Sequence, residues 1–301
     1  MTPLTLALIG FGFVLLCAAA PFLSRILCRV WGMEKPNFAG NVIPSATGLT
    51  FLLVGAAVYG FLPTTGATLG IAFAPPFLMV CVGFGILGLF DDKFGSRAVG
   101  GFKGHIGALL KGKPTTGAIK LVVGGVLALL AAFLIHRFDW GNLLLTATII
   151  ALGANTLNLL DTRPGRAQFG FFALYALPVT AATFLALYQL RYIQPGMLPD
   201  DVLHHTPAGV LLGPLVVAAA TEWWSDARGK TMMGDTGSNL LGATGALAAA
   251  VTLPLPGRIG LLLILIAVNV IAERFSLNAL IERNRLLRAC DAALGTRAVK
   301  P

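Results

Sequence analysis

Long runs of apolar residues alternate with short polar segments along the whole chain. A helix needs about 20 apolar residues to cross a membrane, and somewhat fewer where flanking residues reach the interface. The sequence therefore predicts an all-α bundle of nine membrane spans in a single domain, residues 1–301. The nine spans are expected near residues 4–23, 44–62, 69–90, 117–135, 143–160, 169–190, 206–221, 237–253 and 259–272.

The composition supports a membrane protein and argues against a soluble one. Hydrophobic residues make up 56% of the chain and charged residues 12%, against about 25% charged residues in a typical soluble domain. No basic residue precedes the first apolar run, and further runs follow it, so we expect a retained helix and not a cleaved signal peptide. The four cysteines show no metal-binding or redox spacing, which predicts a packing role.

The basic residues predict the orientation of the bundle. The chain has 22 lysines and arginines. With nine spans, only Arg137, Arg191 and Arg258 lie in the loops of one face, and all the others lie on the opposite face. The positive-inside rule then places the N-terminus outside and the loops after odd-numbered spans, with the tail 273–301, in the cytoplasm. This topology and attraction to the lipid bilayer explain the net charge of +9 without a nucleic-acid partner.

Carboxylates mark the ends of three apolar runs. Asp91 and Asp92 end the third run, Asp161 ends the fifth, and Asp235 precedes the eighth. Adjacent carboxylates repel by roughly 1 to 4 kcal/mol unless a cation or proton lies between them. All four fall on the predicted cytoplasmic face, which indicates a divalent-metal site at the interface. A transporter would more often place ionisable groups within its spans.

The segment that ends the fifth run carries further polar groups. Asn155, Asn158 and Asp161 are spaced by three residues, so a helix places them along one face. Their oxygens suit magnesium, a sugar or a nucleobase, although hydrogen bonding between helices is an alternative for asparagine. Arg163 and Arg166 follow in a turn and are available to phosphate.

Two other segments are suited to phosphate. The loop from 91 to about 116 combines glycines with lysines such as Lys103, although a solvated basic loop would have the same composition. Lys120 lies at the mouth of the next span, where a lysine needs a partner or an interface. Asp235 and Ser238 belong to MGDTGS at a helix start, where they can cap the helix and also hold metal and phosphate.

These three motifs together resemble a known enzyme family. DD after the third span, NTLNLLD at the end of the fifth and MGDTGS before the eighth occur in this order in the polyprenyl-phosphate N-acetylhexosamine-1-phosphate transferases. That family includes phospho-N-acetylmuramoyl-pentapeptide transferase. The resemblance extends over roughly residues 25 to 285.

The resemblance implies a reaction in the bacterial plasma membrane, with the active site facing the cytoplasm. A UDP-N-acetyl amino sugar would donate its sugar phosphate to undecaprenyl phosphate and release UMP, with Mg²⁺ as cofactor, in the synthesis of peptidoglycan or other envelope precursors. The implied magnesium ligand is Asp235, with Asn158 or Asn155 as a further ligand or orienting group. Whether the chain forms a homodimer is left open.

The same resemblance implies roles for the other residues. Asp91 and Asp92 would position or activate the lipid phosphate, without a distinction between the two. Lys120 would neutralise charge during attack on phosphorus, and Asp161 would organise the nucleotide side. Substrate contacts are further expected from Asn155, Arg163, Arg166, Lys103 and Ser238.

Two departures from the family pattern keep a second hypothesis open. The second aspartate of the family's NLxDGxDGLA motif is Pro164 here, and the tail 273–301 lacks the histidine-rich segment and tenth span of the pentapeptide transferases. The leucines of the tail instead predict an interfacial amphipathic helix, or a helix packed on the bundle. A catalytically degenerate relative that binds the lipid carrier or acts as a scaffold is the alternative. The motifs of aromatic prenyltransferases and phosphatidyl-alcohol transferases are absent from the sequence.

Overall fold

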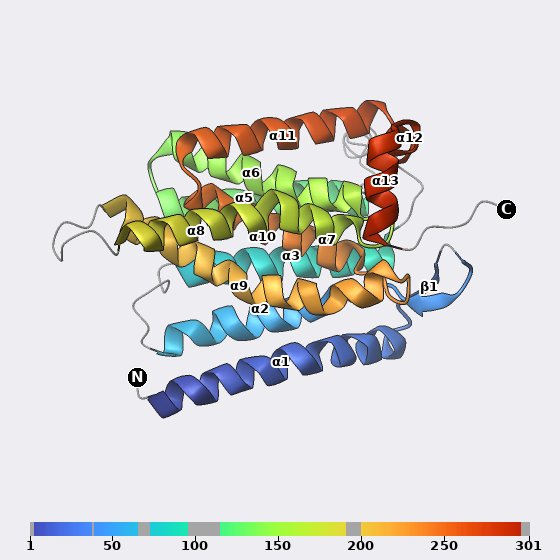
Figure 1. The fold of residues 1–301 in the computed structure, drawn as a ribbon, viewed down its shortest axis with the longest axis horizontal. Coiled ribbons are helices and arrows are strands. Elements are labelled where there is room, and N and C mark those ends of the chain that lie inside the picture. Colours follow the sequence, from blue (N-terminus) through green and yellow to red (C-terminus); the bar gives the residue numbers. More distant parts are fainter. Residues whose placement is uncertain (1–2, 38, 66–72, 96–114, 191–199, 296–301) are drawn as a thin grey trace.

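The computed structural model confirms the all-α prediction, because helices run alongside one another through the whole bundle (Figure 1). It describes residues 3–37, 39–65, 73–95, 115–190 and 200–295. The helices are α1 (Pro3–Val30), α2 (Leu49–Phe61), η1 (Leu62–Thr65), α3 (Ala74–Phe94), α5 (Thr116–His136), α6 (Trp140–Leu160), α7 (Arg166–Phe171), a π-helical turn η3 (Phe172–Ala176), α8 (Leu177–Leu190), α9 (Asp200–Ala227), α10 (Gly234–Thr252), α11 (Leu255–Arg274), α12 (Leu277–Arg283) and α13 (Arg285–Leu294).

Several of these helices are suited to a membrane. By length and composition, six helical segments among the described residues could each cross a bilayer: Leu8–Val30, Ala74–Phe94, Thr116–His136, Trp140–Leu160, Arg166–Tyr188 and Leu255–Arg274. The other three predicted spans are also helical in the structure, as α2, α9 and α10. The prediction of transmembrane helices is therefore supported for six of them.

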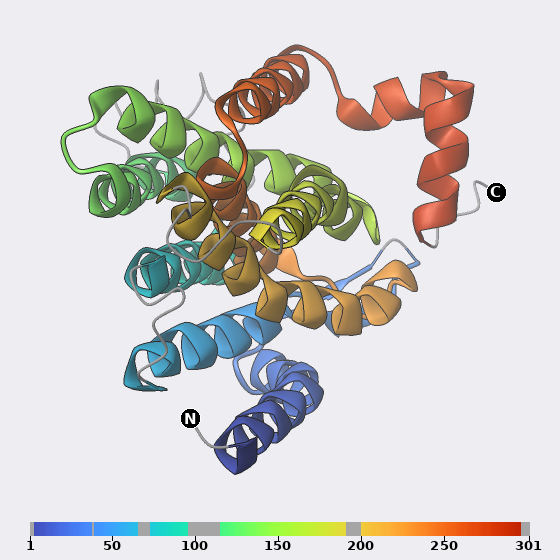
Figure 2. The ribbon, with the colours of Figure 1, turned by 60° about the vertical axis from the view of Figure 1, so that its left-hand side comes forward.

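Helix α10 lies at the centre of the bundle. Every residue from Thr236 to Thr252 is buried, and Figure 2 shows this helix surrounded by the others. Its glycines and alanines allow close packing, since Gly242 meets the backbone of Gly153 in α6. Its main neighbours are α3 and α6, which are the helices that carry the other two acidic motifs.

A small hairpin and the residues after it hold the segment that leads into α10. Strands β1 (Glu34–Pro36) and β2 (Val42–Pro44) pair antiparallel. Beyond them, the amides of Thr47 and Gly48 donate to the carbonyls of Met232 and Met233, each at 3.0 Å, and the Met232 amide donates to Pro44 at 2.9 Å. The start of α10 is thus held by backbone hydrogen bonds to the segment before α2.

The tail folds into two helices where the sequence predicted one. The break is at Asn284, whose side chain caps α13 by accepting from the amides of Leu286 and Leu287, each at 3.0 Å. Helix α13 lies across the end of the bundle near β1 (Figure 1) and packs against α7. The contact with α7 fits the alternative of a helix packed on the bundle.

Candidate active site

Three charged side chains from three helices meet at this end of the bundle. The ammonium of Lys120 on α5 donates to Asp91 Oδ2 of α3 at 3.0 Å and also to Asp235 Oδ2 of α10. The Lys120 side chain is only 16% exposed, so it has lost most of its hydration. Two carboxylates compensate for this loss, and the ammonium in turn reduces the repulsion between them. The first and third acidic motifs are therefore joined through one cation.

Asp92 faces a different partner from its neighbour Asp91. Its Oδ1 accepts from the backbone amide of Asp235 at 3.0 Å. Its Oδ2 accepts from the amide of Thr236 at 2.9 Å and from Thr236 Oγ1 at 2.7 Å. The free amides and the dipole of a helix N-terminus favour a negative charge at this place. Asp92 therefore caps α10 from another helix and fixes the backbone that carries Asp235.

Two glycines allow this close approach. Gly234 has a φ of +66°, which favours glycine, and a Cβ there would also collide with the Asp92 carboxylate and the Ser45 carbonyl. On α3, a Cβ at Gly88 would collide with the backbone of Asp235. The contact between α3 and the start of α10 thus depends on the absence of two side chains.

The second motif approaches the same helix N-terminus through Asn158. Ser238 Oγ lies 3.4 Å from Asn158 Oδ1 and also donates to the Gly234 carbonyl at 3.1 Å. Further along the turn, Asn239 Nδ2 donates to the Asp235 carbonyl at 2.6 Å. Amide and hydroxyl oxygens therefore surround the first turn of α10 on the side of α6.

Asp161 is the acid of the second motif. It follows the last residue of α6, and burial raises the pKa of its carboxyl well above the usual range. The pKa is raised further by nearby carboxylates, those of Asp226, Asp235 and Asp92. Asp226 Oδ2 itself accepts from the Gly165 amide at 2.7 Å. The raised pKa favours the protonated, neutral carboxyl of Asp161, whereas a bound cation would favour the ionised form that can act as a ligand.

Asn155 is used between helices. Its Nδ2 donates to Asn269 Oδ1 of α11 at 2.6 Å. Asn269 in turn donates to Thr156 Oγ1 at 2.8 Å. Asn155 therefore makes a hydrogen bond between helices, which is the alternative to metal or substrate binding given for asparagine above. Asn158, one turn further along α6, lies beside α10.

Arg166 binds the C-terminal helices. Its Nε donates to Asp291 Oδ1 of α13 at 2.8 Å, and its Nη1 donates to Asn278 Oδ1 of α12 at 2.6 Å and to Thr162 Oγ1 at 3.1 Å. Its side chain is 6% exposed, so it is committed to protein partners. Arg163 lies half-buried in the same loop. Lys103 lies outside the described residues.

The oxygen-rich donor set fits magnesium better than a softer metal. Carboxylates of Asp235 and Asp161, with the amide oxygen of Asn158, are hard ligands of the type that Mg²⁺ prefers. Within the described part of the chain, no three His, Cys, Asp or Glu side chains already converge as a ready-made metal cluster. The Lys120 ammonium is the cation that lies between Asp91 and Asp235 in this structure. No protein-family model matches the chain.

Sequence reasoning missed several residues of this region. They are Asp226, Asn269, Asn278 and Asp291. Asp226 had a signal, because a second acid, Glu222, precedes it by one helical turn near the end of an apolar run. Asn278 and Asp291 had none, because each contacts a residue more than a hundred positions away.

Proposed function

We propose that this chain is a polyprenyl-phosphate N-acetylhexosamine-1-phosphate transferase in the bacterial plasma membrane. The bundle crosses the membrane nine times, with the N-terminus outside and the acidic motifs at the cytoplasmic surface. It transfers a sugar phosphate from a UDP-N-acetyl amino sugar to undecaprenyl phosphate with Mg²⁺ as cofactor. The product serves envelope polysaccharide or peptidoglycan synthesis.

One observation carries this proposal. Acids from motifs separated by more than a hundred residues meet around the start of α10, with Lys120 between Asp91 and Asp235. A bundle that only needed stability would gain little from several carboxylates in one partly buried place, because each loses hydration and repels the others. Phosphoryl transfer needs positioning and neutralisation of charge, and this arrangement supplies both.

The proposed reaction is a displacement at phosphorus. An oxygen of the acceptor phosphate forms a bond to the sugar-linked phosphorus of the donor. The bond from that phosphorus to the bridging oxygen breaks, and the oxygen leaves with its electron pair as part of UMP. Bound magnesium would supply Lewis-acid neutralisation of the diphosphate, held by Asp235 with Asn158 and Asp161.

The protein groups have distinct tasks in this proposal. Lys120 neutralises charge on the transferred phosphoryl group, since its ammonium is already held at the junction of α3, α5 and α10. Asp91 orients that ammonium and faces the acceptor phosphate. Asp92 is a positioning residue, because it acts through the α10 backbone and thus through Asp235.

The experiment is a release assay with purified full-length protein in detergent. Given undecaprenyl phosphate, Mg²⁺ and a panel of UDP-amino sugars, wild-type protein should release UMP with at least one donor, and removal of Mg²⁺ with a chelator should stop the release. The Asp235→Asn variant should lose most of the turnover. The control is Asp139→Asn, which should retain turnover, because Asp139 is an exposed N-cap of α6 and is distant from α10 in the sequence. Equal inertness of wild type and Asp235→Asn across the panel would reject the proposal.

That negative result would favour the second hypothesis, a degenerate relative that binds the lipid carrier or acts as a scaffold. The observation in its favour is the segment after Asp161. There, Pro164 replaces an expected aspartate, and Arg166 is engaged by Asp291 and Asn278.

A further inference from the structure

The C-terminal helices α12 and α13 contact the loop that follows Asp161. Arg166, at the start of α7, donates to Asp291 of α13 at 2.8 Å and to Asn278 of α12 at 2.6 Å. At the other end of the loop, Thr162 Oγ1 donates to the same oxygen, Oδ1 of Asn278, at 3.1 Å. Both ends of the loop between α6 and α7 are therefore bound to the tail.

The backbone of this loop is also held closely by its neighbours. The Gly165 amide donates to Asp226 Oδ2 of α9 at 2.7 Å. A Cβ at Gly165 would collide with the Leu294 carbonyl, and a Cβ at Gly295 would come within 2.8 Å of the Pro164 carbonyl. The last turn of α13 thus lies directly against the loop, and the end of α9 and the tail hold the loop together.

Polar contacts, more than apolar packing, determine the position of the tail. Within Leu277–Arg283 and Arg285–Leu294, which are α12 and α13, no residue is buried. A hollow of about 440 Å³ lies where the end of α13 passes Trp224 and Arg228. The hydrogen bonds of Arg166 are therefore the specific contacts that set how the tail and the loop sit against each other.

The buried arginine indicates a positioning role for this network. The Arg166 side chain has lost most of its hydration. A buried ion pair repays such a loss only with good geometry, and it is weak evidence for stability. It does fix one arrangement of the groups that it joins. Here these groups are the tail and the loop that begins directly after Asp161.

The direction of the Asp161 side chain depends on this loop. On one side, the Asp161 amide donates to the carbonyls of Leu157 at 3.0 Å and Asn158 at 3.2 Å, so α6 fixes the backbone there. On the other side, the next residue is Thr162, which the tail binds through Asn278. A displaced tail would therefore leave the Asp161 carboxyl held from the α6 side and less firmly from the loop side.

We propose that α12 and α13 form a clamp that positions Asp161 for a nucleoside diphosphate bound with Mg²⁺. Asp291 and Asn278 are its positioning residues, because they act through Arg166 and Thr162 and not through contact with the ligand. This inference rests on the proposed function for the identity of the ligand, the UDP part of the donor.

Binding of radiolabelled UDP, the part shared by all donors of the panel, to the full-length protein with Mg²⁺ tests the proposal. Asp291→Asn removes the charged partner of Arg166, and Asn278→Ala removes the contact with Thr162 without a change of charge. Each variant should weaken UDP binding roughly tenfold or more, the loss typical when a residue that orients a metal ligand is removed. Asp291→Glu, which keeps the carboxylate, should recover part of the affinity.

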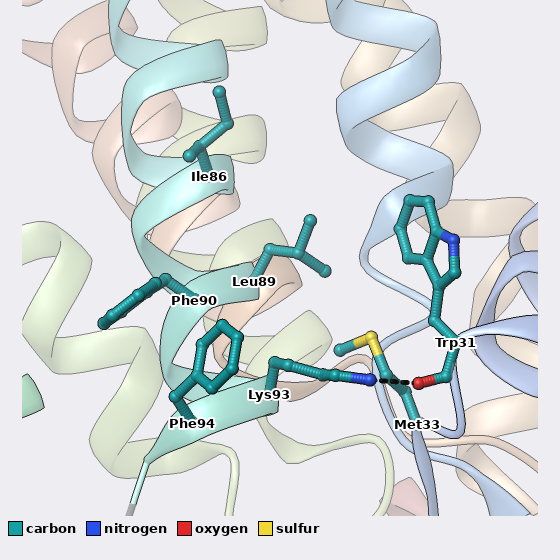
Figure 3. A pocket seen from close by; sticks show the side chains of 7 residues that line it. All are labelled: Trp31, Met33, Ile86, Leu89, Phe90, Lys93 and Phe94. Carbon is teal, nitrogen blue, oxygen red and sulfur yellow. Dashed lines mark hydrogen bonds between the residues drawn. The ribbon is translucent and has the colours of Figure 1, made fainter.

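Two control variants should bind UDP as the wild type does. Glu282→Gln changes an exposed acid of α12. Ile86→Ala changes the apolar hollow beside α3 that Figure 3 shows, which is lined by α3 and the segment after α1. The decisive comparison repeats Asp291→Asn in an Asp161→Asn background. A residue that acts through Asp161 should cause little further loss there, whereas a general loss of packing would add its full effect.

Wild-type affinity in both Asp291→Asn and Asn278→Ala would overturn the proposal, and so would equal losses in the two backgrounds. The assay needs no turnover, so its result is separate from that of the UMP-release assay. Weakened binding in the variants of a protein that releases no UMP would keep the clamp and reject the transferase. Unchanged binding in the variants of an active enzyme would do the reverse. Absence of UDP binding by the wild type would overturn the clamp whatever the UMP-release assay shows.

Discussion

At the scale of single residues, adjacent aspartates have different environments. Asp91 is bound to a lysine side chain, whereas Asp92 is bound to a helix N-terminus. In the sequence the two are equivalent, because both end the same apolar run. Their difference arises from the helix, which turns consecutive side chains about 100° apart and so directs them to α5 and to α10.

Substitution of each aspartate by asparagine should separate these roles. Asp92→Asn replaces an acceptor of three hydrogen bonds by an amide, and should lower the free energy of unfolding by about 1 to 3 kcal/mol together with turnover. Asp91→Asn should lower turnover strongly with a smaller change in thermal stability, because its partner Lys120 retains Asp235. Melting temperature and kcat of both variants are the measurements. A stability loss confined to Asp91→Asn would contradict this assignment.

At the scale of elements, the site depends on how closely α3 approaches α10. Gly88→Ala would place a Cβ against the backbone of Asp235, which cannot move as a flexible side chain could. We expect lower thermal stability and lower turnover. The matched control is Gly125→Ala on α5, where nothing lies within 4 Å of the added atom, and where alanine should be neutral or stabilising by up to about 1 kcal/mol. Equal effects of the two substitutions would show that the contact is not required.

The ion pair between Arg166 and Asp291 should hold α13 on the bundle. Both side chains are mostly buried, at 6% and 14% exposed, so removal of one partner leaves a poorly solvated charge and should destabilise by about 3 to 5 kcal/mol. Hydrogen exchange of residues 285–294 should accelerate in Asp291→Ala. Glu282→Ala on the exposed surface of α12 is the control. Unchanged exchange in Asp291→Ala would show that α13 is held by other contacts.

The sequence predicted the positions of the helices better than the contacts between them. The span expected at 117–135 is α5, Thr116–His136, because an uninterrupted apolar run determines a membrane helix. The first span is predicted at 4–23, but α1 continues to Val30. Arg25 donates to Glu222 and Ser225 of α9, and these contacts support the helix beyond its apolar part. Hydropathy carries no information on such long-range partners.

The same limit applies to the site. The predicted topology already places Asp91 and Asp235 in one region, and a lysine at a helix mouth, such as Lys120, needs a partner. The division of roles between Asp91 and Asp92, and the use of Asn155 by α11, depend on helix rotation and packing. Neither can be derived from spacing along one chain.

At the scale of the whole molecule, the proposed orientation places the two bundle ends in different compartments. Cys17, Cys28 and Cys81 are buried and Cys290 is exposed, so Cys290→Ser gives a suitable background for labelling. In intact cells, an impermeant thiol reagent should label Arg137→Cys, on the outer side, and should not label Lys230→Cys until the membrane is permeabilised. Both positions are exposed. The opposite labelling would reverse the topology and place the acidic site outside.

The central claim is that Asp91, Lys120 and Asp235 form one transferase site, and a double-mutant cycle of turnover tests it most directly. UMP release is compared for wild type, Asp91→Asn, Asp235→Asn and the double variant. Residues that act as a unit give strongly non-additive losses, so the double variant should be no slower than the slower single variant. Multiplied losses, or no UMP release by the wild type, would contradict the claim.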